Sequence, residues 1–199
     1  MTGNTPPLPV ERLFDEELLR NAQRASGLER VAFLAGPFIT IDKAPRKNSR
    51  NSAAILRHFL FHKLTEAGWQ VTLGEYEKMI GATAPLLGDQ NNAALAEFDH
   101  AKSRRTDAIV MLPSSPGSFL ELGSFCHDEN ICRKMLVIVD AQYRTHKNYM
   151  NTGPIIEAEA NGAKIEFIDY SDKDLCWISV EPFVTARARR RAARGIVGR

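Results

Sequence analysis

The sequence has no run of about 18 apolar residues, so it predicts no transmembrane helix. Its first nine residues are polar and rich in proline, and they lack the basic and apolar regions that make up a secretory signal. Because neither a signal nor a membrane span is found, we expect a cytoplasmic protein without a membrane partner.

Cysteine is scarce, and the three cysteines form no CxxC pair. We therefore expect reduced thiols rather than disulfides. The motifs GxxxxGKS/T and GxGxxG are absent, which argues against a kinase and a dehydrogenase. His58 and His62 are four residues apart on a predicted helix and could share a metal, but no third ligand is in register. The sequence thus predicts no metal site and no bound cofactor.

Acidic residues are missing from the C-terminal tail, residues 187–199, which holds six arginines. Without these six, the 26 Lys and Arg fall to 20 against 24 Asp and Glu, so the rest of the chain carries a net charge of −4. A basic tail of this kind can bind nucleic acid or a protein partner. The alternative is a solvated, partly frayed terminal helix.

Five short apolar segments alternate with helical patterns, and no internal repeat is present. This order predicts an α/β fold, a flavodoxin-like or Rossmann-like three-layer sandwich whose five-stranded parallel sheet has the order 2-1-3-4-5. The predicted strands are 30–35, 69–73, 107–112, 135–140 and 164–169, and the predicted helices between and after them are 51–67, 92–105, 118–132, 154–161 and 180–194.

The chain is expected to have three parts. Residues 1–29 form an N-terminal extension with a helix over 10–24, residues 30–180 form the α/β domain, and residues 181–199 form a C-terminal helix with the arginine-rich tail. Within the domain, residues 75–90 are predicted to be irregular and residues 141–152 to form a polar loop.

In this strand order the chain reverses direction between the first and third strands, and ligands bind at the carboxyl ends of such strands. The two loops at this point are Gly36-Pro37-Phe38 and Pro113 to Ser118. The second loop is small and polar, and it precedes a helix whose free N–H groups and dipole attract anions. We therefore predict a phosphate-binding corner.

Glu121 follows this corner directly. The pair Ser118-x-x-Glu121 has the spacing of a capping box, in which Glu121 would only bind the backbone of its own helix. The alternative is a catalytic role, because the small loop lets a ligand approach and Gly123 is a poor helix former beside the carboxylate.

Asp99, on the preceding helix, could supply a second carboxylate. Two carboxylates suit cleavage of an N-glycosidic bond, since one attacks or stabilises the oxocarbenium-like centre and the other acts on the leaving base. Asp99 could equally be a solvated helix residue. Asp107, at the start of the third strand, is expected to be a structural cap.

Three motifs together resemble the nucleoside 2-deoxyribosyltransferase family and its nucleotide N-glycosidase relatives. Phe33 to Phe38 is similar to the first-strand signature that closes over base and sugar, and Asp99 precedes Asp107 by eight residues, as in the family. Gly117 to Gly123 is similar to the motif whose glutamate attacks the anomeric carbon. The resemblance covers roughly residues 30–140.

The resemblance implies that Glu121 is the nucleophile or stabilises the oxocarbenium-like centre, and that Asp99 orients the sugar or helps the leaving base. The transferases usually carry an aspartate where this sequence has Ser115. A second carboxylate repels a phosphate dianion, whereas a hydroxyl attracts it, so hydrolysis of a nucleoside 5′-monophosphate or related nucleotide such as NAD is favoured over base exchange. The implied substrate-binding residues are Gly36, Pro37 and Phe38 over the base, and Ser114, Ser115, Gly117 and Ser118 at the phosphate.

The N-terminal helix, the 75–90 insertion and the arginine tail suit a specialised member, such as an effector in antiviral defence or a toxin. The resemblance also implies a homo-oligomer. Three alternatives remain: a nucleoside 2-deoxyribosyltransferase, a non-catalytic nucleotide sensor of the same fold, and a nucleic-acid-binding module led by the tail.

Overall fold

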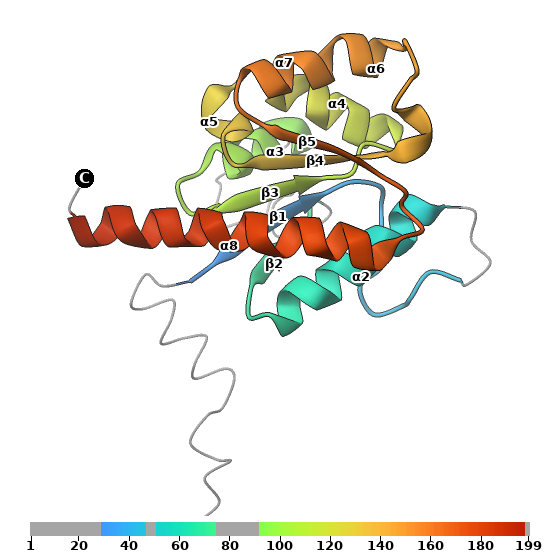
Figure 1. Ribbon diagram of the computed structural model, residues 1–199. Coiled ribbons are helices and arrows are strands. Elements are labelled where there is room, and N and C mark those ends of the chain that lie inside the picture. Colours follow the sequence, from blue (N-terminus) through green and yellow to red (C-terminus); the bar gives the residue numbers. More distant parts are fainter. Residues whose placement is uncertain (1–28, 47–50, 75–91, 198–199) are drawn as a thin grey trace, which may run out of the picture.

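The computed structural model describes residues 29–46, 51–74 and 92–197, and it places five strands in one sheet (Figure 1). The strand order is β2-β1-β3-β4-β5, and every neighbouring pair is parallel. The predicted α/β fold and strand order are therefore confirmed. The strands are β1 (Val31–Ala35), β2 (Gln70–Thr72), β3 (Ala108–Met111), β4 (Met135–Asp140) and β5 (Lys164–Ile168).

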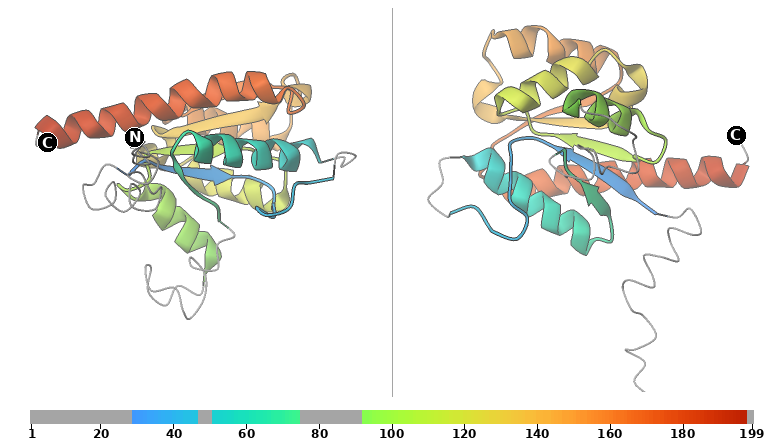
Figure 2. Two further views of the ribbon diagram at one scale, coloured as in Figure 1. Left: turned by 90° about the horizontal axis from the view of Figure 1, so that it is seen from below. Right: turned by 180° about the vertical axis from the view of Figure 1, so that it is seen from behind.

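The three central strands, β1, β3 and β4, are buried along their whole length because helices cover both faces of the sheet. Figures 1 and 2 show the sheet between two helical layers. The layer that shares one apolar core consists of α2 (Ser52–Glu66) and α8 (Lys173–Val197). The opposite layer contains α3 (Ala93–Lys102), α4 (Pro116–Phe125), α5 (Glu129–Cys132) and α7 (Pro154–Ala160).

The helix predicted over 118–132 is wrong as a single element, since α4 and α5 are separate helices. The side chain of Asp128 accepts hydrogen bonds from the backbone N–H groups of Asn130 (2.9 Å) and Ile131 (3.2 Å) and so caps α5. An N-cap residue has an extended backbone, and this interrupts the helical path after α4.

Two further boundaries differ from the prediction. The polar loop expected over 141–152 contains the 3-10 helix η2 (Ala141–Tyr143) and the short helix α6 (Tyr149–Thr152). The last helix begins at Lys173 rather than at residue 180, so the boundary placed at 180 falls inside α8. The predicted helix over 10–24 and the irregular segment over 75–90 lie outside the described residues. Across the part of the chain that the structure describes, no helix is long and apolar enough to cross a membrane.

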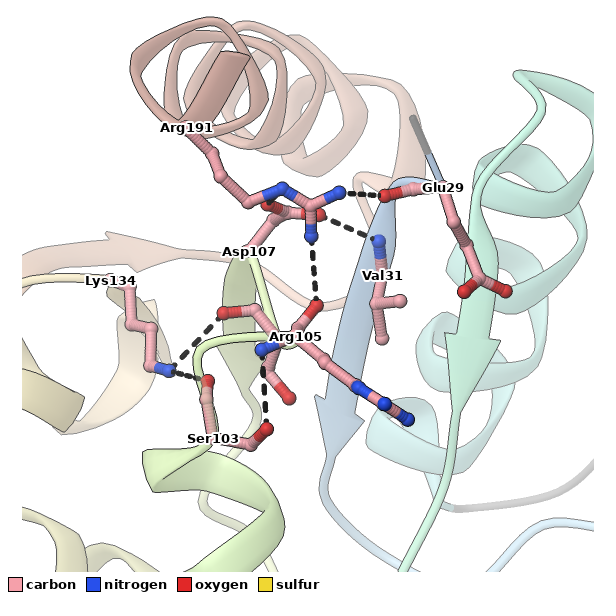
Figure 3. A network of polar contacts seen from close by, with 8 residues as sticks. Glu29, Val31, Ser103, Arg105, Asp107, Lys134 and Arg191 are labelled. Atoms are coloured by element: carbon pink, nitrogen blue, oxygen red, sulfur yellow. Dashed lines mark hydrogen bonds and ion pairs between the residues drawn. The ribbon is translucent and has the colours of Figure 1, made fainter. Parts of the chain in front are cut away.

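Asp107 has the structural role that the sequence predicts, at the end of the sheet where the strands begin (Figure 3). Its Oδ2 accepts a hydrogen bond from the backbone N–H of Val31 (2.8 Å), and its Oδ1 lies 3.0 Å from Nε of Arg191 on α8. Arg191 also donates to the backbone carbonyl oxygens of Arg105 (3.2 Å) and Glu29. One arginine of the tail is therefore used inside the fold, where it ties α8 to the starts of β1 and β3.

His100 on α3 packs against the face of the sheet that α3 covers. Its Nε2 lies 2.7 Å from Oγ1 of Thr72, and its ring packs edge-on against Phe33 with centroids 5.1 Å apart. Burial, together with the positive charge of Lys134, lowers the pKa of His100 from 6.5 to about 4.

We expect the free energy of unfolding to fall as the pH drops from 7 to 4. The unfolded chain protonates His100 near pH 6.5 and the folded chain only near pH 4, so the unfolded state binds the extra proton in this window. The loss is absent above the window and reaches about 3 kcal/mol below it.

Urea unfolding across this pH range measures the effect. His100→Gln should flatten the pH dependence of the unfolding free energy, while His146→Gln, at an exposed position, should leave it unchanged. Equal slopes for His100→Gln and the wild type would contradict the assignment.

Candidate functional site

The two loops predicted to form the site meet where β1 and β3 end. The backbone N–H of Leu112 donates to the carbonyl oxygen of Ala35 (3.0 Å), which holds the strand ends together. Gly36 follows with φ of +157°, and a Cβ there would lie 3.2 Å from Cβ of Leu112 and 3.2 Å from Cδ of Arg57. A side chain there would press on both neighbours in a backbone conformation that side chains rarely adopt, so glycine favours this close approach of the first loop to the end of β3.

Arg57 on α2 binds the backbone of this loop. The sequence analysis did not identify this residue. Its side chain is 1% exposed. Its Nε and Nη2 donate to the carbonyl oxygen of Leu34 (3.2 and 2.7 Å), and its Nη1 donates to that of Pro37 (2.7 Å). A signal was present in the sequence, because Arg57 falls between Ala53 and Leu60 at the spacing of the buried helix face.

Pro37 and Phe38 have opposite environments. Pro37 is buried and its carbonyl oxygen accepts from Arg57, whereas Phe38 is 71% exposed. An aromatic ring held on an anchored loop beside a ligand site can cover a flat, apolar ligand.

The N-terminus of α4 forms the other side of the site, and it begins earlier than predicted. Ser115 is the N-cap, Pro116 is the first helical residue, and the reciprocal capping box joins Ser115 to Ser118. The predicted box between Ser118 and Glu121 is therefore wrong. Proline at the first helical position has φ already set for the helix, which favours the earlier start.

The capping box uses some of the serines expected at a phosphate. Oγ of Ser118 accepts from the backbone N–H groups of Ser114 and Ser115 (2.9 Å each) and donates to the carbonyl oxygen of Ser115 (3.0 Å). Oγ of Ser114 is buried and has no hydrogen-bond partner among the residues described. Gly117 is exposed, and a Cβ there would meet nothing within 4 Å. Of the three serines expected at the phosphate, Ser115 and Ser118 are therefore bonded to each other, whereas the hydroxyl of Ser114 has no such bond.

Glu121 lies in the second turn of α4 rather than in its capping turn. The residue is half-buried and its Oε2 is buried. At three residues from Ser118 and four from Phe125, it shares a helix face with both. A Cβ on Gly123 would meet nothing within 4 Å, but two residues along a helix point about 200° apart, so this open space does not lie beside Glu121. The carboxylate therefore lies one turn behind the corner formed by Pro113 to Ser118.

Asp99 is less well placed. It is exposed on α3, and its backbone carbonyl accepts the N–H of Ser103 (2.9 Å) at the helix end. Its neighbour Phe98 faces α4, where it packs against Phe125 with ring centroids 6.2 Å apart. Successive helix residues point about 100° apart, so Asp99 is turned away from the α3–α4 contact.

We searched the described residues for a metal site and for a reactive thiol. No group of three or more His, Cys, Asp or Glu is arranged to hold a metal there, and Nε2 of His58 and of His62 lie 3.3 Å apart without a third ligand. All three cysteines are free and buried, and burial raises the pKa of Cys132 and Cys176 to about 12. A thiolate nucleophile is therefore disfavoured.

Comparison with known proteins relates the chain to retrons. The family model described as STM3845 retron effector protein matches residues 54–191, more than half of the chain. The Escherichia coli protein named "Retron Ec86 putative ribosyltransferase/DNA-binding protein" is 37% identical over 70 residues, which are 35% of this chain and 23% of that protein. The Escherichia coli protein of retron Ec73 with the same description is 28% identical over 61 residues, 31% of this chain and 19% of that protein. The matched segments thus cover less than a quarter of either relative.

The anchored loop of β1 can be tested through its glycine. Gly36→Ala should lower the free energy of unfolding by about 1–3 kcal/mol, because the new Cβ meets Leu112 and Arg57 and the backbone conformation disfavours a side chain. Gly117→Ala is the matched control: its Cβ meets open space in a helix, so its stability should be unchanged or up to about 1 kcal/mol higher. Equal effects of the two substitutions in urea unfolding would contradict the close approach of the loops.

Proposed function

This chain belongs to the STM3845 retron effector protein family, and on that premise we propose that it cleaves the N-glycosidic bond of a nucleoside 5′-monophosphate or a related nucleotide such as NAD. Such an effector acts in antiviral defence by destroying a nucleotide pool. The word ribosyltransferase in the names of the two relatives supports chemistry at the anomeric carbon of a ribose.

The position of Glu121 carries this proposal. The capping role that could have explained the residue belongs to Ser118 instead, so the helix start does not require a carboxylate at position 121. The residue lies one turn from the N-terminus of α4, where backbone N–H groups and the helix dipole favour a phosphate. A nucleotide held there by its 5′-phosphate brings its sugar toward the carboxylate.

The proposed reaction has two steps. A carboxylate oxygen of Glu121 attacks C1′ of the sugar, the C1′–N bond breaks, and the base leaves with the bonding electron pair and takes up a proton. A water molecule then attacks C1′ of the glycosyl-enzyme and gives up a proton. This releases the sugar phosphate and restores the free carboxylate. Asp99 remains the candidate that assists the leaving base. It is exposed on α3, and a residue that protonates a bound base is usually more enclosed.

Hydrolysis is favoured over base exchange by the N-cap of α4. Aspartate and serine both serve as N-caps, so a cap at this position does not require a carboxylate. Ser115 fills the position without adding negative charge beside the proposed phosphate. The N-terminus of α4 then supplies the donors for the anion, and Ser114, whose hydroxyl has no hydrogen-bond partner among the described residues, is the serine that can join them.

We expect Glu121→Gln to release base at least about 10³-fold more slowly than the wild type, because an amide cannot attack C1′. Chromatography of free base after incubation with a panel of 5′-monophosphates and NAD measures the rate. Glu159→Gln, at an exposed position on α7, is the matched control and should retain full activity.

The same assay separates the alternatives. Base release by Glu121→Gln at the wild-type rate would rule out the proposed nucleophile. Tight binding of intact nucleotide by the wild type would instead indicate a sensor, and transfer of the sugar to an added second base would indicate a transferase.

A second candidate function is nucleic-acid binding through α8, which two observations favour. Both relatives carry DNA-binding in their names. The C-terminal part of α8 extends past the end of the sheet where the strands begin (Figures 1 and 2). Arg189 and Arg190 precede Arg191 on this helix, and both are exposed without an ion-pair partner among the described residues. Exposed arginines of this kind bind phosphate groups.

The double substitution Arg189→Gln/Arg190→Gln should weaken binding to a DNA duplex and reduce the slope of log K against log salt concentration by about 2, because each arginine that is removed leaves one phosphate without its cation. Fluorescence anisotropy over a salt series measures both. Arg46→Gln, at an exposed position in the segment that follows β1, is the control and should leave the slope unchanged. An unchanged slope in the double variant would exclude α8 as the binding surface, and base release should be unaffected in either case.

A further inference from the structure

Strand β5 is the last strand of the sheet, so within the described residues one of its two sides has no neighbouring strand. The N–H of Ile109 on β3 donates to the carbonyl oxygen of Lys134 (2.7 Å), so the even-numbered residues along β4 direct their backbone toward β3 and the odd-numbered ones toward β5. Val137 is level with Ile165 in the parallel register and therefore bonds to positions 164 and 166. The backbone groups of Ile165 and Phe167 consequently point outward.

A bond to Arg144 supports this direction. Nη2 of Arg144 donates to the carbonyl oxygen of Phe167 (2.8 Å), which β4 therefore leaves available. Across the part of the chain that the structure describes, the N–H and the carbonyl oxygen of Ile165 have no partner of this kind. An edge strand with such backbone groups can pair with another strand, and the bond of Arg144 confines this pairing to residues 164–166.

The charges on this edge are complementary to themselves. Lys164 and Glu166 lie on one face of β5, where Nζ and Oε1 are 2.5 Å apart, and their side chains are 50% and 25% exposed. When two β5 strands pair antiparallel around Ile165, Lys164 of each copy lies opposite Glu166 of the other. A lysine on an edge strand usually prevents pairing by repulsion, but here each lysine meets a glutamate, so the charges favour the pair.

Apolar side chains at the start of α8 lie beside this edge. Helix α8 follows β5 directly (Figure 1), and Oγ of Ser179 donates to Oε2 of Glu166, so this part of the helix lies over β5. Leu175 is four residues before Ser179 and three before Ile178, so all three share one side of the helix. Leu175 is 47% exposed and Ile178 is 65% exposed. Large apolar side chains that are exposed together indicate a contact surface, and these two flank the unpaired strand.

We propose that β5 is the surface through which two copies of this chain form a homodimer. The two β5 strands run antiparallel around a twofold axis at Ile165, where the N–H of each copy donates to the carbonyl oxygen of the other. Two ion pairs between Lys164 and Glu166 flank these bonds. Both α8 helices then lie on one face of the joined sheet, with Leu175 and Ile178 of the two copies side by side. A twofold contact uses the same surface on both copies, so it closes as a dimer and leaves no free end for a filament.

Analytical ultracentrifugation of the full chain over a concentration series measures the mass and the dissociation constant of the dimer. The wild type should reach twice the mass of the 22.2 kDa chain. Lys164→Glu and Glu166→Lys each place like charges opposite one another, so each should raise the dissociation constant about 10-fold or more. Lys43→Glu, at an exposed position in the segment that follows β1, is the charge-matched control and should leave the constant unchanged.

Mixing the two single variants separates a contact between copies from the ion pair within one strand. Lys164→Glu leaves only acidic side chains on the edge and Glu166→Lys only basic ones, so a pair of unlike chains is complementary and a pair of like chains is not. The equimolar mixture should therefore dimerise with about the wild-type constant. Ile178→Asp is an independent variant and should also weaken the dimer, because it places a charge in the apolar contact.

Three results would overturn the proposal. The first is a wild type that stays monomeric throughout the concentration series. The second is a dimer whose dissociation constant Lys164→Glu, Glu166→Lys and Ile178→Asp leave unchanged, since the contact would then lie elsewhere on the molecule. The third is a mixture of the two charge variants that dimerises no better than either variant alone.

Discussion

The buried guanidinium of Arg57 is the interaction on which the carboxyl edge of the sheet depends. Water cannot reach this charge, so backbone carbonyl oxygens must bind it, and those of Leu34 and Pro37 do so. These bonds hold the end of β1 and the turn that follows it in one place. The close approach of Gly36 to Leu112, and hence the contact between the two loops of the candidate site, rests on that anchor.

The two edges of the sheet serve different purposes. At the edge where the strands begin, Asp107 and Arg191 join β1, β3 and α8, and Lys134 donates to the carbonyl oxygens of Ser103 (2.7 Å) and Thr106 (3.1 Å), so the charges there are bound within the fold (Figure 3). At the carboxyl edge, Gly36 lets the loop after β1 approach the end of β3, and the ring of Phe38 is exposed. Rigid packing at one edge is what the candidate site at the other edge requires.

The sequence predicted the sheet well because its strands are short apolar runs that need no distant partner to be recognised. It misplaced the start of α4 because Ser115 and Ser118 are both good caps, and Pro116 decided between them. The contact between Glu97 and Gly74 could not be predicted, since Gly74 is 23 positions earlier in the chain. Asp99 was selected by its spacing from Asp107, but spacing along a chain does not determine which face of a helix a side chain occupies.

The sequence by itself determined the order of the strands, the loop at the switch point and the presence of Glu121 beside it. These features follow from local patterns, namely apolar runs, glycine and proline positions and helix periodicity. Only the tertiary structure decided which residues meet: Arg57 with the end of β1, Arg191 with Asp107, and Glu97 with Gly74. The physical reason is that buried charge and close backbone contact are properties of packed neighbours, and packing joins residues that the chain keeps apart.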